Sequence, residues 1–545
     1  MTVITAKARR VSPLEVARLA PSELDARITG NGEIAVVDVR EEGVFSRRHL
    51  FFAVNIPLSH LELRLDRLIP RRGTPIVLVD AADGLAERAA ERLGRFGYRD
   101  VAILGGGVDA WQAAGFELFG GVNVPSKAFG EFVERLEGTP HIAAAELVRM
   151  RAEGRPVVVL DSRPIDEFRT MSIPGALDCP GAELVHRIFE LAPPPETTVV
   201  VNCAGRTRSI IGAQSLINAG IPNKVVALED GTMGWHLAGF QLDHGIEQVA
   251  PAPTEKGRAR AGEAAARVAA RFGVRRLAGE ALARLKGEDD RTLYIFDVRT
   301  EEEFEAGHVP GAVWAPGGQL VQATDTFAAV RNARIVLTDD DAVRATLTAS
   351  WLLQLGWNDV WVLDPEVGKS EIGKAPSLVA GLDDVEVEII DADRLAGWLG
   401  QPGTAVIDLA DSRKFRRGHV PHAQFAIRSR LGDLRETLLN AGRVVVTSPD
   451  GVLARLGAAD LVGIIERPVF ALQGGTQAWV AAGHALDKDD GNLPEAPDDV
   501  WYRPYDRKSG IEEAMHQYLN WEVGLLAQVE RLGCRPFRAF SRVDP

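Results

Sequence analysis

Apolar runs recur at matched spacing along the chain, and stretches with a helical period separate them. Four of these runs have the spacing of a buried strand and end in an aspartate, at Asp38, Asp161, Asp297 and Asp408. A second apolar run follows each aspartate after a turn, and these second runs end at Asp80, Cys203, Asp339 and Ser448. Strands that alternate with helices in this order predict parallel sheets covered by helices on both faces. The pattern therefore predicts an α/β chain made of four copies of one unit.

Each copy has the length of an ordinary domain, so we predict four tandem domains rather than one solenoid. The expected domains are residues 1–122, 123–250, 263–375 and 376–488, and residues 489–545 form a helical C-terminal extension with one long amphipathic helix. The stretch 248–262 mixes proline, alanine and charge without clear periodicity, which predicts a linker. A linking helix is expected to begin after Pro125, with Ser126 as its cap.

Composition and charge narrow the class of protein. The chain of 545 residues has a formal net charge of −14, which argues against nonspecific nucleic-acid binding. Its three cysteines are too few for a disulfide scaffold and are typical of a reducing compartment. No signal peptide and no membrane span are expected, so the sequence predicts a cytoplasmic protein. No metal-spaced cluster and no nucleotide-binding loop is found, and neither a cofactor nor a metal is expected.

Cys203 is the candidate nucleophile. It ends a valine-rich strand, and a short loop and the start of a helix follow it in the sequence CAGRTRS. Loop amides and the positive end of a helix dipole favour an anion at such a place. Two permanent cations, Arg206 and Arg208, follow within the same loop. These influences all favour thiolate over thiol, the ionisation state that makes a cysteine nucleophilic.

The other three copies lack this chemistry. Asp80 and Asp339 place carboxylates where Cys203 stands, and a carboxylate there repels an anionic substrate. Ser448 has no visible base, and Pro449 removes an amide donor from its loop. Domains 1, 3 and 4 are therefore predicted to be inactive.

At this point the unit resembles the rhodanese homology domain, a sulfurtransferase fold. The resemblance rests on two motifs: D-x-R-x-x-x-E-F with G-H-x-P-G-A, clearest at 297–312, and the cysteine loop that ends the second strand. A closing L-x-G-G-x-x-A-W motif, clearest at 104–111 and 472–479, supports it, although the third copy has lost this motif. The whole arrangement is similar to bacterial proteins with four tandem rhodanese domains.

The resemblance implies that a Cys203 persulfide carries sulfane sulfur from thiosulfate or a persulfide donor to cyanide or a thiol. The expected substrate-binding residues are Ala204, Gly205, Arg206, Thr207, Arg208, Ser209, Arg163 and Trp235. The loop amides are expected to stabilise the persulfide, and Arg206 or Arg208 the sulfonate of the donor. Asp161 and Glu167 are expected to be structural, and Arg163 either neighbours the site or pairs with them.

Two other classes of function remain as alternatives. A cysteine-dependent phosphatase or arsenate reductase needs cysteine, five residues and then arginine, whereas here Arg208 comes one residue early and Ser209 takes that place. A sulfur carrier or regulatory scaffold with one persulfide-bearing domain is the other alternative, and turnover with small acceptors distinguishes it from an enzyme.

The sequence does not decide the roles of two further residues or of the C-terminal helix. Cys179 could act as a resolving thiol, and a buried apolar role is the simpler interpretation. His236 could approach the site because it lies beside Trp235, although a surface position is the ordinary expectation. The long C-terminal helix is compatible either with packing onto a domain of the same chain or with a homodimer.

Overall fold

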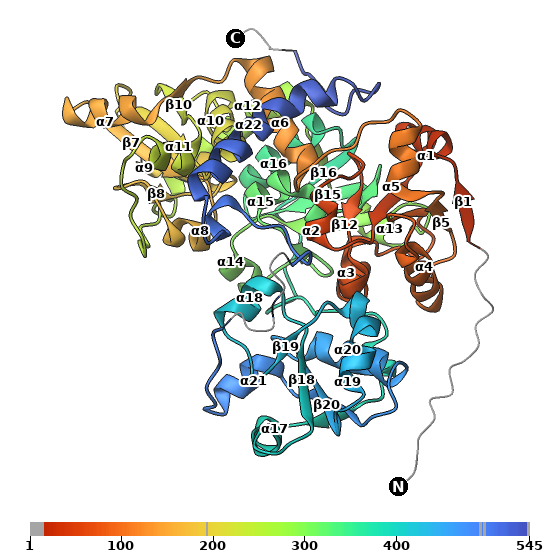
Figure 1. Cartoon of the computed structure of the whole chain (residues 1–545). Coiled ribbons are helices and arrows are strands. Elements are labelled where there is room, and N and C mark those ends of the chain that lie inside the picture. The colour runs from red at the N-terminus through yellow and green to blue at the C-terminus, as the bar shows by residue number, and fades with distance from the viewer. Residues whose placement is uncertain (1–15, 192–193, 490–492, 494–496, 542–545) are drawn as a thin grey trace.

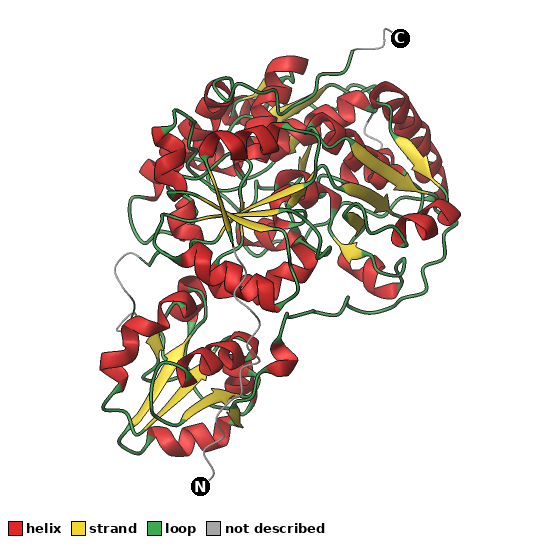
Figure 2. Cartoon of the chain, turned by 90° about the vertical axis from the view of Figure 1, so that its right-hand side faces the viewer, coloured by secondary structure: helices red, strands yellow, loops and turns green. Residues whose placement is uncertain are grey.

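The computed structural model describes residues 16–191, 194–489, 493 and 497–541, and it forms four α/β units and a helical tail (Figure 1). Every unit is built on a parallel sheet with helices on both faces, as Figure 2 shows. The predicted fold class and the four tandem units are thereby confirmed, together with a helical C-terminal portion. The exact domain boundaries stay predictions.

Domain 1 contains the first apolar runs of the chain. Its elements are β1 (Ala17–Leu19), α1 (Pro21–Thr29), β2 (Ile34–Asp38), α2 (Glu42–Phe45), β3 (Val54–Asn55), η1 (Leu58–His60), α3 (Leu61–Leu68), β4 (Ile76–Val79), α4 (Leu85–Arg95), β5 (Val101–Leu104) and α5 (Gly107–Ala113). The strand order is β1-β5-β4-β2, with β3 paired to β2.

Domain 2 repeats this order as β6-β10-β9-β7-β8. Its elements are α6 (Val124–Glu137), β6 (His141–Ile142), α7 (Ala144–Ala152), β7 (Val157–Asp161), α8 (Ile165–Thr170), β8 (Leu177–Asp178), α9 (Glu183–Leu191), β9 (Thr198–Asn202), α10 (Thr207–Asn218), β10 (Val225–Leu228) and α11 (Gly231–Leu237).

Domain 3 has the order β11-β16-β15-β12-β13, and its described residues lack the short helix that follows the last sheet strand in the other units. Its elements are α12 (Glu255–Phe272), β11 (Arg275–Leu277), α13 (Gly279–Lys286), β12 (Leu293–Asp297), α14 (Glu301–Ala306), β13 (Val313–Trp314), α15 (Gly317–Gln322), η2 (Thr324–Thr326), β14 (Val330–Arg331), β15 (Arg334–Thr338), α16 (Val343–Gln354) and β16 (Asp359–Leu363).

Domain 4 has the order β17-β21-β20-β18-β19, and the tail follows it. The elements are η3 (Leu382–Asp384), β17 (Glu388–Ile390), α17 (Ala392–Leu399), β18 (Thr404–Asp408), α18 (Ser412–Arg417), β19 (Gln424–Phe425), η4 (Arg428–Leu434), α19 (Arg435–Leu438), β20 (Arg443–Thr447), α20 (Val452–Val462), β21 (Val469–Leu472), α21 (Gly475–Ala481), η5 (Pro504–Asp506) and α22 (Ile511–Val529).

The four units pack against one another through a shared sheet, a shared core and ion pairs. Strand β14 of domain 3 pairs antiparallel with β2, so it extends the sheet of domain 1. One continuous apolar core contains residues of both domains. Domain 4 contacts domain 1 through Arg428, whose Nη1 lies 2.6 Å from Glu62 Oε2. Domain 4 lies below the other three units in Figure 1, and α22 crosses the top of the molecule beside α6.

Two local predictions are corrected. The expected linker 248–262 contains the first half of α12, because an alanine-rich segment with high helix propensity follows a Thr254 cap. Helix α12 buries Ala261, Ala264 and Val268 between domains 2 and 3. Helix α6 begins before Ser126, with Asn123 as its cap residue, and the Ser126 hydroxyl donates to the Val321 carbonyl at 2.8 Å.

Candidate active site

The loop around Cys203 is positioned by the central strand of domain 2. Every residue of β9 is buried, and Cys203 directly follows its carboxyl end with 2 % of its surface exposed. The carbonyls of Cys203 and Ala204 accept hydrogen bonds from the Thr232 and Met233 amides at the start of α11. The sharp turn before α11 needs Gly231, since a Cβ there would lie 2.2 Å from the Cys203 carbonyl oxygen.

Loop amides remain available for an anion. Among the described residues, the amides of Ala204, Gly205 and Arg206 donate to no backbone carbonyl. The Cys203 thiol itself donates to Ser209 Oγ at 3.5 Å. A run of free amides before the start of α10 is the arrangement that accommodates negative charge in proteins.

The equivalent loops of domains 1 and 3 show how the amides of such a loop bind a carboxylate. Asp80 accepts hydrogen bonds from the Ala82 and Ala86 amides, at 2.8 and 3.0 Å. The Asp339 carboxylate binds its own loop in the same way, through the Ala342 and Ala345 amides. A carboxylate fixed in the chain therefore occupies the loop amides of these two domains, and their inactivity stays a prediction.

The two arginines of the loop lie in different environments. Arg208 forms a two-point ion pair with Glu167, with nitrogen–oxygen distances of 2.9 and 2.7 Å, and both residues line the cavity that contains Cys203. Burial alone would raise the pKa of Glu167, but the Arg208 guanidinium lowers it to about 2. Glu167 is therefore ionised at neutral pH, and it anchors Arg208 beside the thiol.

Arg206 does not line this cavity. It is held by three carboxylates, those of Glu131, Glu134 and Asp230, at 2.8, 2.5 and 3.4 Å. Glu131 and Glu134 lie on α6, so Arg206 ties the cysteine loop to this helix. In the structure the Arg206 guanidinium contacts carboxylates of the protein, and this geometry favours a structural role over the predicted contact with the donor.

Arg163 and Trp235 also lie outside the cavity lining. Arg163 is buried and pairs with Asp161 through two bonds of 2.8 Å, which is the second of the two positions that the sequence left open for it. Trp235 is buried in the domain core, where its indole donates to the Gln241 carbonyl at 2.8 Å. Asp161 also accepts a bond from Asn202, which lies next to Cys203 in the chain.

The cavity of about 440 Å³ around Cys203 is built by every part of the chain. Domain 2 supplies Cys203, its loop, Glu167, Asn123 and Lys127. The other domains and the tail contribute the polar and aromatic lining residues Glu42, Gln322, Thr326, Arg413, Trp501, Arg503, Tyr505 and Tyr518. The three domains without a cysteine therefore form walls of the site.

Sequence reasoning missed the contribution of the tail. The run Trp501-Tyr-Arg-Pro-Tyr505 is dense in aromatic residues for a chain with 6 % aromatic content, and this was the available signal. Helix α22 lies directly on the cysteine loop, since a Cβ on Gly205 would lie 3.0 Å from Glu522 Oε2. The tail thus packs onto domain 2 of its own chain.

Other candidate residues lie elsewhere. Cys179 is fully buried in the domain core and is absent from the cavity lining, and burial raises the pKa of its thiol. His236 is partly exposed and faces Glu512 at 3.7 Å. Within the described ranges, the one group with metal-ligand spacing is His419, Asp487 and Asp489 in domain 4, none of which lines the cavity. No helix of the described residues is long and apolar enough to cross a bilayer.

A buried ion pair attaches the tail to the site. Glu522 is fully buried, and its Oε1 lies 3.0 Å from Lys127 Nζ and accepts a bond from the Thr207 hydroxyl at 3.3 Å. Burial alone would lower the pKa of Lys127, but Glu522 raises it above its usual value. Lys127 is therefore a permanent cation on the cavity wall.

Replacing Glu522 with alanine is expected to lower the free energy of unfolding by about 3 kcal/mol, because it leaves the buried Lys127 cation without a partner. Urea unfolding measures this loss. Glu513→Ala on the exposed face of α22 is the control, with an expected change within about 0.5 kcal/mol. The double variant Glu522→Leu, Lys127→Met should recover most of the loss, and no recovery would contradict a direct coupling of the two charges.

An α/β unit with a cysteine loop at the carboxyl end of its central strand defines the class of this protein. A family model for the rhodanese-like domain matches residues 20–114, 143–238 and 277–365. The chain belongs to the rhodanese-like family, and sheet β17-β21-β20-β18-β19 is the fourth unit of the same build.

Two known proteins illustrate the relationship. A crystal structure of a thiosulfate sulfurtransferase from Pseudomonas aeruginosa is 48 % identical, covers 96 % of this chain and 100 % of its own, and superposes with a TM-score of 0.93. The prediction of a rhodanese-type enzyme is thereby confirmed. An HTH-type transcriptional regulator, Rv0324 of Mycobacterium tuberculosis, is 36 % identical over 110 residues, which are 20 % of this chain and about half (47 %) of the regulator.

Proposed function

We propose that the protein is a sulfurtransferase that moves sulfane sulfur from thiosulfate to a thiol or to cyanide through a persulfide on Cys203. The observation that carries this proposal is the position of Cys203 in a cavity whose lining holds four cationic side chains and no second thiol among the described residues. The cations are Lys127, Arg208, Arg413 and Arg503. The full-length similarity to a thiosulfate sulfurtransferase supports thiosulfate as the donor.

In the first step the Cys203 thiolate attacks the outer sulfur of thiosulfate. A new sulfur–sulfur bond forms, the bond within thiosulfate breaks, and sulfite leaves with the electron pair. In the second step the acceptor thiolate or cyanide attacks the outer sulfur of the persulfide, and Cys203 leaves as a thiolate. No external oxidant or reductant is needed.

Each neighbouring group has a part in these steps. Arg208 binds the anionic end of thiosulfate, and its ion pair with Glu167 fixes its orientation. The free amides of the loop from Ala204 stabilise the negative charge of the persulfide. Arg206 holds the loop on α6 instead of binding the donor. The low cysteine content supports a reducing, cytoplasmic setting for a persulfide carrier.

Intact-mass spectrometry after incubation with thiosulfate tests the proposal. We expect one added sulfur atom, located on the Cys203 peptide, and its loss when cyanide is added. Label on Cys179 or Cys534 with an unmodified Cys203 would contradict the mechanism. A carrier that serves a single protein partner would also form the persulfide, but it would turn over slowly with cyanide.

A further inference from the structure

Tyr505 of the tail lines the catalytic cavity with a hydroxyl that the protein itself does not use. Three lining residues carry a hydroxyl: Thr326, Tyr505 and Tyr518. The Thr326 hydroxyl donates to the Ala323 carbonyl at 2.8 Å, and the Tyr518 hydroxyl donates to Glu522 Oε1 at 3.0 Å. The Tyr505 hydroxyl has no such acceptor within the described part of the chain. It is therefore the lining hydroxyl that is left for a substrate.

The Tyr505 ring is held beside the cysteine loop by packing. It packs against the buried apolar cluster that contains Ala204, Met233 and Leu519. Ala204 is the residue that follows Cys203 in the chain. Close packing of the ring limits the positions that the hydroxyl can take. The hydroxyl is thus placed near the reacting sulfur by the fold itself.

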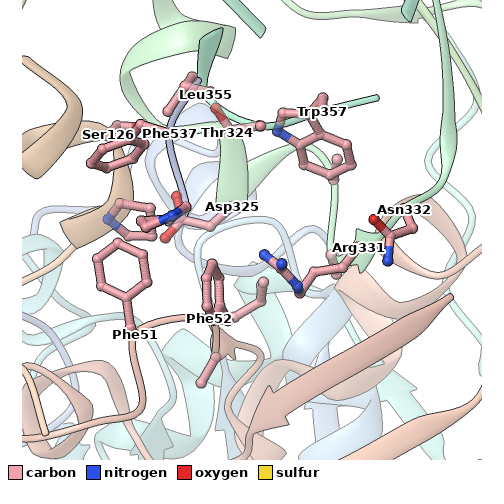
Figure 3. A pocket seen from close by; sticks show the side chains of 17 residues that line it. Phe51, Phe52, Ser126, Thr324, Asp325, Arg331, Asn332, Leu355, Trp357 and Phe537 are labelled. Carbon is pink, nitrogen blue, oxygen red and sulfur yellow. The ribbon is translucent and has the colours of Figure 1, made fainter. Parts of the chain in front are cut away.

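The segment that carries Tyr505 is anchored on both sides. Before it, the buried Asp499 carboxylate accepts hydrogen bonds from the amide and the hydroxyl of Ser412, at 2.6 and 2.7 Å. After it, Phe537 packs against Phe51 in the pocket between domains 1 and 3, with 6.4 Å between the ring centres, and Figure 3 shows both rings. Tyr505 therefore belongs to a fixed wall of the catalytic cavity.

Tyr505 and Cys203 lie near the same cation. Burial alone would lower the pKa of Arg208, but the Glu167 carboxylate raises it. Cys203 and Tyr505 add smaller contributions in the same direction, which places both groups near this guanidinium. Burial raises the pKa of the Tyr505 phenol above its usual value, although Arg503, whose guanidinium carbon is 4.9 Å from the centre of the ring, opposes the rise. The phenol is therefore protonated at neutral pH and is a hydrogen-bond donor.

Arg208 alone does not satisfy a sulfonate group. A guanidinium has five N–H donors, and three of those of Arg208 donate to Glu167 and Gln319, at 2.9, 2.7 and 3.2 Å. The other two serve at most two of the three oxygens of a sulfonate, so a further donor is needed beside Arg208. The phenol of Tyr505 is a donor of the required kind on the same lining.

We propose that the Tyr505 phenol donates a hydrogen bond to the sulfonate of thiosulfate and to the sulfite that leaves, so that the tail supplies a catalytic residue to domain 2. This inference rests on the proposed function, because it assigns a residue to the first of the two steps. In that step Cys203 bonds to the outer sulfur, the sulfur–sulfur bond of thiosulfate breaks, and its electron pair moves onto sulfite. The phenol keeps its proton, and its hydrogen bond strengthens as negative charge increases on the sulfite oxygens, which accelerates the step.

Single-turnover kinetics of the full chain with Tyr505→Phe test this proposal, because this variant removes the hydroxyl and keeps the ring. Rapid quench and intact-mass spectrometry follow persulfide formation on Cys203 over a range of thiosulfate concentrations. The maximal loading rate divided by the half-saturating concentration is expected to fall about 10-fold or more, the effect of one hydrogen bond to a charged group. Transfer from the loaded enzyme to cyanide should change less than about twofold, since sulfite leaves before this step. The thermal midpoint should equal that of the wild type, because the hydroxyl has no hydrogen bond to lose.

Tyr502→Phe is the matched control. Its hydroxyl belongs to the same tail, lies 2.6 Å from Ser412 Oγ and does not line the catalytic cavity. This variant should load and discharge sulfur as the wild type does. Three outcomes would overturn the proposal: loading by Tyr505→Phe at the wild-type rate, an equal loss in both half-reactions, or the same loss in Tyr502→Phe.

Failure of this proposal is distinguishable from failure of the proposed function. A wild type that forms no Cys203 persulfide with thiosulfate refutes the proposed function, and the role of Tyr505 with it. A wild type that forms the persulfide, together with a Tyr505→Phe variant that forms it equally fast, refutes the role of Tyr505 alone.

Discussion

Replacing Cys203 with serine is expected to lower the rate of sulfur transfer from thiosulfate by about 10³-fold or more. A serine hydroxyl is not ionised at neutral pH and cannot hold the transferred sulfur as a persulfide. Nothing else in the cavity substitutes for it, because no other thiol lines the described walls. The measurement is steady-state formation of thiocyanate from thiosulfate and cyanide.

The structure also predicts that this variant folds. Domain 4 carries Ser448 at the position of Cys203, where its hydroxyl accepts a bond from the Ala454 amide at 3.1 Å. The loop therefore tolerates a serine without rearrangement. Cys534→Ser, in the tail, is the control for cysteine replacement and should keep its activity. Retention of more than about a tenth of the rate by Cys203→Ser would refute the proposed nucleophile.

The fourfold repeat of the sequence pattern allowed a more complete prediction of the fold than residue propensities alone would have allowed. The periodicities of apolar residues that indicate strands and helices are local and weak in one copy. Four aligned copies give four independent observations of each element. The position of Cys203 is an example: its side chain contacts residue 209, and Asp80, Asp339 and Ser448 contact the residue at the same offset. One backbone geometry thus accommodates aspartate, cysteine and serine at the same position.

The composition of the catalytic cavity is not a local property. Arg413 comes from domain 4 and Tyr505 from the tail, and both reach Cys203 only because the domains assemble on one another. The linker prediction at 248–262 failed for a related reason: the alanine-rich segment after Thr254 has helix propensity, and the packing of α12 against α9 and α16 adds stability that the sequence does not show. Contacts between distant segments are set by the assembled surfaces, and one sequence does not display them.

The two loop arginines illustrate the same limit at the level of single residues. From the sequence, Arg206 and Arg208 were equal candidates for the donor. Their different roles depend on which carboxylates approach them: those near Arg206 lie on α6 and just before α11, and the one near Arg208 lies on α8. Replacing each arginine in turn therefore tests the different roles that the structure indicates for them.

Arg208→Met is expected to lower kcat/KM for thiosulfate by about 100-fold, mainly through KM, because it removes the buried cation that binds the donor. The loss of its partner would leave Glu167 unpaired, so a double variant with Glu167→Gln is needed to separate charge from folding. The double variant should regain stability without regaining affinity for thiosulfate. Arg208→Lys should show an intermediate KM, since it keeps the charge but loses the two-point geometry.

Arg206→Met is expected to have the opposite signature. It leaves Glu131, Glu134 and Asp230 close together without their cation, so the thermal midpoint should fall while KM for thiosulfate of the folded fraction changes less than about threefold. Kinetics and thermal unfolding on the same preparations measure both effects. If Arg206→Met raised KM and Arg208→Met only lowered stability, the roles assigned to the two arginines would have to be exchanged, and the donor would approach Cys203 from the side of α6.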